Sequence, residues 1–172
     1  KNIPFFDTSN VTNASYMFAN AYNIPTIPQL DFSSVTDASY MFNGCMHLTS
    51  IPQLDFSNVT TMYQMFNNCY DLIIIPQLDT SKVTDMRSTF AGCTSLTTIP
   101  QLDTSKVTTM NYILSNCPSL TTVEGIDFSG LTSSLSLFGY GSNMTNLTRF
   151  IVNGKINVSM GSYSIEMLPV ID

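Results

Sequence analysis

Four cysteines recur at a fixed interval and are the first residues whose type suggests metal binding or disulfide formation. They occur once every 24 residues, at Cys45, Cys69, Cys93 and Cys117. Metal-binding cysteines are usually paired at short spacings such as Cys-x-x-Cys, which this chain lacks. Side chains stacked on adjacent repeats point the same way rather than toward one another, which disfavours disulfides. We therefore predict free, buried thiols, with disulfides as the alternative.

A second column carries carboxylates at the same interval, each followed two residues later by serine. The aspartates are Asp7, Asp31, Asp55, Asp79, Asp103 and Asp127. A row of carboxylates could hold cations, but the dense Asp/Asn/Gly pattern of a calcium loop is missing. In Asp-x-Ser the carboxylate accepts the amide two residues on, which ends an extended segment in a turn. We predict this turn role, with metal binding as the alternative.

No set of residues for catalysis is found. His47 is the only histidine, and no Ser-His-Asp set, His-Glu-x-x-His motif or dinucleotide-binding loop occurs. We expect no enzyme activity and no cofactor. The net charge of −6, with only six Lys and Arg residues, argues against nucleic acid as a partner. No apolar run approaches the roughly 20 residues of a membrane span, so no membrane insertion is expected within this segment.

The cysteine and aspartate columns belong to a 24-residue repeat. The stretch IPQLDTSKVT occurs identically from Ile75 and from Ile99. A fixed period of this size is typical of solenoid proteins, in which each unit buries its apolar face against the next. We therefore predict one domain over residues 1–172, with regular units over 3–146 and an irregular unit over 147–172. Because the chain begins and ends at the same point of the unit, we expect it to be cut from a longer protein.

Within one unit, the spacing of apolar residues predicts a short helix after the aspartate turn. Val83, Met86, Phe90 and Cys93 lie three and four residues apart, as on one face of a helix, and Thr84 is placed to cap it. A column of only Asn or Gly, residues that tolerate the left-handed conformation of a helix C-cap, follows at Asn20, Gly44, Asn68, Gly92 and Asn116.

The rest of the unit predicts a strand of about three residues around each isoleucine, ending at Pro28, Pro52, Pro76 or Pro100. The expected fold class is α/β: a leucine-rich-repeat solenoid with short parallel strands on the concave face and short helices on the convex face. In the last unit, Asn153-Gly154 lies between two apolar segments and predicts a β-hairpin.

The repeated pattern Leu-x-x-Ile-Pro-x-Leu-Asp-x-Ser-x-Val-Thr-x-Met-x-x-Met-Phe-x-x-Cys resembles the BspA-like bacterial surface proteins with leucine-rich repeats. It covers residues 3 to about 146 and is closest to the full motif over 27–102. Toward the end Leu114 replaces Phe, and Glu124-Gly125 replaces Pro-Gln. The resemblance implies a repeat protein that is displayed on a bacterial surface, or carried by a phage tail, and binds other macromolecules.

Because the core columns are nearly identical between units, recognition must come from columns that vary. One is the loop before each strand, where Tyr22, His47 and Tyr70 lie. Another is the pair before the strand isoleucine, which is Thr or Ser in most units but Ile73-Ile74 in one. Apolar residues rimmed by polar ones are typical of contact sites. The alternative is that a neighbouring unit buries one isoleucine, or that the repeats have simply drifted.

We therefore expect a non-catalytic binding or adhesion module of the bacterial cell surface, with a protein or glycan as its macromolecular partner. The alternative is a structural or host-recognition segment of a phage tail or fibre, which would place the chain in the virion. Exposed strand edges at the end of an open solenoid also predict end-to-end self-association.

Overall fold

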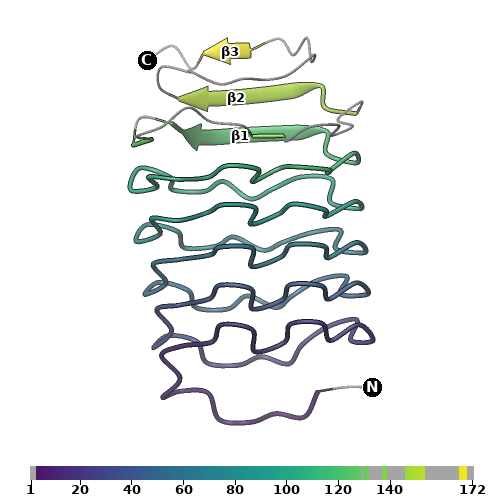
Figure 1. Ribbon diagram of the computed structural model, residues 1–172, viewed down its shortest axis with the longest axis vertical. Helices are drawn as coiled ribbons and strands as arrows, with labels where there is room; N and C mark the ends of the chain where they lie inside the picture. Colours follow the sequence, from purple (N-terminus) through teal and green to yellow (C-terminus); the bar gives the residue numbers. More distant parts are fainter. Residues whose placement is uncertain (1–2, 129, 132–136, 139–145, 154–166, 170–172) are drawn as a thin grey trace.

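In the computed structural model, the chain winds into a stack of 24-residue coils (Figure 1). The description covers residues 3–128, 130–131, 137–138, 146–153 and 167–169. The coils follow one another along the long axis, and the three strands lie at the C-terminal end. Parallel bridges one repeat apart hold the coils in register through Asn13, Asp37, Thr61, Asp85 and Thr109. The period read from the sequence is therefore the length of one turn of the stack.

The predicted helix is wrong, because the described residues contain no helix. In residues 62–69, alternate amides donate to the next coil: Met62 to Asp85 at 2.9 Å and Gln64 to Arg87 at 3.0 Å. Most of the amides between them donate three residues back, as Met65 does to Met62 at 3.0 Å. Fewer than half of the amides thus bond within the segment, and none of these bonds has the four-residue span of an α-helix. The segment is a row of consecutive turns.

Positive backbone φ angles explain why a helical spacing does not give a helix here. Each coil contains two such residues four positions apart: Tyr16 and Asn20, Tyr40 and Gly44, Gln64 and Asn68, Ser88 and Gly92, Tyr112 and Asn116. The prediction of a left-handed conformation in the Asn/Gly column is confirmed. The other column was not predicted, and its left-handed residues break the segment where a helix would need negative φ.

The strands predicted to end at Pro28, Pro52, Pro76 and Pro100 are also wrong, because the described residues before Thr122 form no strand. The strand β1 covers Thr122–Asp127 and is the first in the described chain. Earlier coils have proline at the position of Glu124, as at Pro100, and proline has no amide hydrogen to donate to a ladder. Strand formation at β1 therefore coincides with the loss of that proline. The expected α/β leucine-rich-repeat solenoid is corrected to a stack of turns, isolated bridges and a short sheet.

The irregular last unit adds two further strands to this sheet. The strand β2 covers Arg149–Asn153 and β3 covers Met167–Pro169, in the parallel order β1-β2-β3. Thr122 pairs with Arg149, an offset of 27 residues instead of 24, and the register shifts around Gly125, whose φ is +74°. The predicted hairpin turns at Asn153-Gly154, and its second segment, through Met160, lies outside the described residues.

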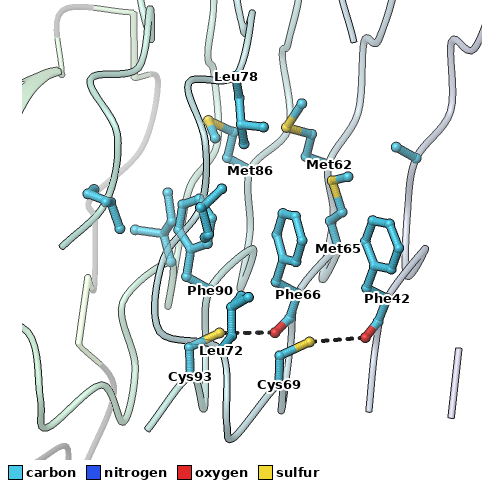
Figure 2. Packing of buried hydrophobic residues seen from close by; sticks show 14 of the residues in the cluster. Phe42, Met62, Met65, Phe66, Cys69, Leu72, Leu78, Met86, Phe90 and Cys93 are labelled. Carbon is cyan, nitrogen blue, oxygen red and sulfur yellow. Dashed lines mark hydrogen bonds between the residues drawn. The ribbon is translucent and has the colours of Figure 1, made fainter. Parts of the chain in front are cut away.

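The core is a set of apolar columns inside the stack (Figure 2). The rings of Phe42 and Phe66 stack with centroids 5.3 Å apart, and those of Phe66 and Phe90 lie 6.0 Å apart. Each cysteine thiol donates to the carbonyl of a phenylalanine in the preceding coil, as Cys69 does to Phe42 at 3.1 Å. The apolar residues spaced by three and four therefore do face one interior, although by way of turns.

Candidate functional site

The two columns that could carry chemistry have structural roles. All four cysteines are free and buried, which confirms that prediction. Burial raises the pKa of the Cys45 thiol to about 11 and that of Cys117 to about 12, so these thiols stay protonated at neutral pH. Among the residues that the structure describes, no group of three or more His, Cys, Asp or Glu is placed to hold a metal ion.

The aspartates form the predicted turns. The Ser81 amide donates to Asp79 Oδ1 at 3.0 Å and its hydroxyl donates to the same oxygen at 2.7 Å. Asp103 is held in the same way by Ser105. These hydrogen bonds favour the charged carboxylate and lower the pKa of Asp79 and of Asp103. The Asp79 and Asp103 carboxylates therefore end the extended segments, and their hydrogen bonds favour the charged form.

The residues proposed for recognition are all exposed. Ile73 is 51% exposed and Ile74 is 57% exposed, so neither is buried by a neighbouring coil. The Ile73 amide donates to Thr49 on the preceding coil, and the Thr97 amide donates to Ile73. In the aligned columns, threonine or serine occupies the flanking positions: Thr49 and Ser50 before, Thr97 and Thr98 after. Ile73 and Ile74 thus interrupt a face that otherwise carries hydroxyl side chains. We call these two residues the apolar step.

Tyr70 and His47 lie on the loops beside this step. The Asp71 amide donates to the Met46 carbonyl at 3.1 Å, which sets the loop of Tyr70 against the loop of His47. His47 Nδ1 lies 2.8 Å from Asp71 Oδ2, with both side chains at least half exposed. Tyr22 is exposed on the loop of the coil before. We call Tyr70, Ile73 and Ile74 the apolar patch. His47 lies on the adjacent loop, and Tyr22 lies one coil further away.

A second exposed aromatic surface escaped the sequence analysis. The rings of Tyr16 and Tyr40 stack with centroids 4.4 Å apart, and the Tyr63 ring meets Tyr40 edge-on at 5.0 Å. The Arg87 guanidinium covers Tyr63 at 4.7 Å and pairs with Asp85 at 2.6 Å. Hydrogen bonding to Tyr63, together with burial, raises the pKa of the Tyr40 hydroxyl. The 24-residue interval between Tyr16 and Tyr40 was the available signal. We call Tyr16, Tyr40 and Tyr63 the tyrosine column.

In the tyrosine column, most ring faces are already occupied. Tyr40 is covered by Tyr16 on one face and approached by the edge of Tyr63, whose own ring is covered by Arg87. In the apolar patch, by contrast, the isoleucine side chains have no such cover. The apolar patch is therefore the better candidate for a contact site.

Together, the fold and the site define a repeat protein in which the described residues place no group of three or more His, Cys, Asp or Glu for a metal ion. A family model, described as Mycoplasma protein of unknown function, DUF285, matches residues 1–74 and again residues 73–148. The chain belongs to this family. The interpretation as a BspA-like leucine-rich-repeat protein is wrong, because the matching family is a different one and the described residues lack the helices it implied. No curated protein and no solved structure matches significantly. Among the described residues there is no helix that could span a membrane.

Proposed function

We propose that this chain is a non-catalytic binding module of a bacterial cell-surface protein, whose partner is an extracellular macromolecule. The observation that carries the proposal is the apolar step of Ile73 and Ile74, both about half exposed on a face where the flanking coils present Thr and Ser. Maintaining exposed isoleucines has no benefit for the core of the stack. Apolar residues exposed among polar neighbours are instead typical of contact sites.

The rigidity of the scaffold supports the same proposal. Main-chain hydrogen bonds join each coil to the next on both sides of the apolar step, at Thr49 and at Thr97. The interior of the stack is a core of stacked rings and buried aliphatic side chains (Figure 2). A surface held in this way loses little conformational entropy when it binds a partner. Large, rigid side chains such as Tyr70 then supply contact area at low entropic cost.

The test is binding of the immobilised chain to a panel of extracellular-matrix glycoproteins, purified glycans and whole cells. The matched variant is Ile73→Thr with Ile74→Thr, which installs the residue type of the flanking coils and keeps the backbone bonds. Burying the exposed half of each isoleucine is worth about 1 kcal/mol, so the double variant should bind about 30-fold more weakly. Saturable binding that the variant retains in full would contradict the proposal, as would binding to no member of the panel.

A further inference from the structure

A polar hollow of about 650 Å³ opens on the stack where the repeat pattern changes. Its lining includes Thr98 and Gln101 from one coil, Thr122, Glu124 and Gly125 from β1, and Ile151 from β2. These elements are held together by the bridge from Thr98 to Thr122 and by the pairing of β1 with β2. The hollow is therefore built on hydrogen-bonded main chain from three successive coils.

At this hollow the repeat lacks one side chain. In earlier coils a glutamine ladder fills this column: Gln29 donates to the Gln53 carbonyl and Gln53 to the Gln77 carbonyl, both at 2.7 Å. The next position in the column after Gln101 is Gly125, which has no side chain. A Cβ atom placed there would lie 3.1 Å from the Gln101 side chain, and the φ of +74° also favours glycine. Gly125 thus leaves room for the Gln101 side chain to lie against the main chain of β1.

The Gln101 amide is available to a ligand. The three earlier glutamines each donate to the carbonyl one coil further on, but within the described residues Gln101 makes no such bond. Its Nε2 lies beside Gly125, at 3.3 Å from the position of a Cβ atom there. The amide therefore offers two donors and one acceptor at the edge of the hollow.

The hollow is polar but nearly neutral, because its one charged lining residue, Glu124, is paired with Arg149 beside the hollow. Arg149 Nε lies 2.8 Å from Glu124 Oε1, and both side chains are about half exposed. This pairing balances the charge and leaves further donors on the guanidinium and a second carboxylate oxygen. Thr98 and Thr122 add hydroxyl groups, and Ile151 adds an apolar wall.

We propose that this hollow binds a sugar residue of a neutral glycan. Vicinal hydroxyls need donors and acceptors close together, which the amide, the carboxylate and the threonine hydroxyls provide. The C–H face of a sugar ring packs against apolar side chains, and Ile151 provides one in the lining of the hollow. Because Glu124 and Arg149 pair with each other, they leave no net charge that would attract a charged ligand.

The hollow continues the face that carries the apolar patch. Ile74, Thr98 and Thr122 occupy the same column on three successive coils, which are roughly 5 Å apart. One extended chain can therefore contact the apolar patch and fill the hollow. This inference rests on the proposed function, and it narrows the partner from a macromolecule in general to a glycan.

The experiment is a titration of the intact chain with neutral oligosaccharides of hexose and N-acetylhexosamine units, followed by saturation-transfer NMR and calorimetry. Sialylated and sulfated oligosaccharides and unglycosylated peptides form the comparison arms. The variants are Thr122→Val and Glu124→Gln, which preserve side-chain size. Thr60→Val is the control for the same chemical change, since Thr60 is exposed and lies on a different column.

We expect saturable binding of at least one neutral oligosaccharide. Each pocket variant should weaken it by about 5-fold or more, the effect of one lost hydrogen bond of about 1 kcal/mol, whereas Thr60→Val should stay within about 2-fold. Binding of no neutral oligosaccharide, preference for the acidic ones, or equal binding by all variants would overturn the inference. If a matrix protein binds through Ile73 and Ile74 while no saccharide does, the inference fails and the proposed function stands.

Discussion

Replacing Ser88 by glycine tests whether this segment is a row of turns or a helix. The two structures predict different changes in the free energy of unfolding. Ser88 has a φ of +55°, and its amide donates to Asn111 on the next coil at 2.9 Å. A left-handed conformation costs a residue with a side chain about 1–2 kcal/mol, and glycine removes that cost. Glycine also adds about 0.5–1 kcal/mol of unfolded-state entropy. The net expectation is unchanged stability or a gain of up to about 1.5 kcal/mol. In a helix, the same change would instead be destabilising.

The assay is equilibrium unfolding in urea, monitored by circular dichroism, for the wild type and two variants. The matched control is Ser95→Gly, which makes the same chemical change at a residue without positive φ on the same coil. We expect Ser95→Gly to lower the free energy of unfolding by about 0.5–1 kcal/mol, and Ser88→Gly not to lower it. An equal loss of stability for both variants would refute the assignment of a left-handed turn at Ser88.

Three further predictions concern the core, the thiols and the aspartate turns. Phe66→Ala should destabilise the chain by about 3–5 kcal/mol, because the ring is fully buried between two others; urea unfolding measures this, and a loss below about 1 kcal/mol would contradict the packing. A thiol reagent at pH 8 should label none of the four cysteines quickly in the folded chain and all four in denaturant; rapid labelling of the folded chain would show that the thiols are not buried. Ser81→Ala should raise the pKa of Asp79 toward its ordinary value in a carboxyl-resolved NMR titration. Since the folded pKa of Asp79 lies below the unfolded one, its stabilising contribution is present above about pH 4 and lost as pH falls through the folded pKa; an unchanged Asp79 titration in the variant would argue against the turn.

The interior could be predicted from the sequence, whereas the local backbone could not. Spacings of three and four residues placed Val83, Met86, Phe90 and Cys93 on one buried side, and the structure buries all four. The same spacing arises from consecutive turns, which is why the helix was wrong. At the second left-handed position, the presence of only Asn or Gly predicts the positive φ angle. Tyr16, Gln64 and Ser88 at the first position gave no such signal, because these residue types rarely adopt positive φ.

The candidate site was visible in the sequence in part. The substitution of Thr by Ile73 and of Ser or Thr by Ile74 identified the apolar patch, and both side chains are exposed. In the sequence, Gly125 is only a departure from Pro-Gln. That it lines a hollow depends on the Gln101 side chain and on the strand from the next unit, which lies 27 residues away instead of 24. A strict period does not reveal that neighbour.

The most direct test of the account compares affinity losses at the two exposed aromatic and apolar surfaces. With a partner identified in the binding panel, the dissociation constant is measured for wild type, for Ile73→Thr with Ile74→Thr, and for Tyr16→Thr. Each variant is first shown to unfold like the wild type. The account predicts that the isoleucine variant loses about 30-fold in affinity and that Tyr16→Thr, in the tyrosine column, stays within about 2-fold. Loss of binding by Tyr16→Thr with full affinity in the isoleucine variant would contradict it.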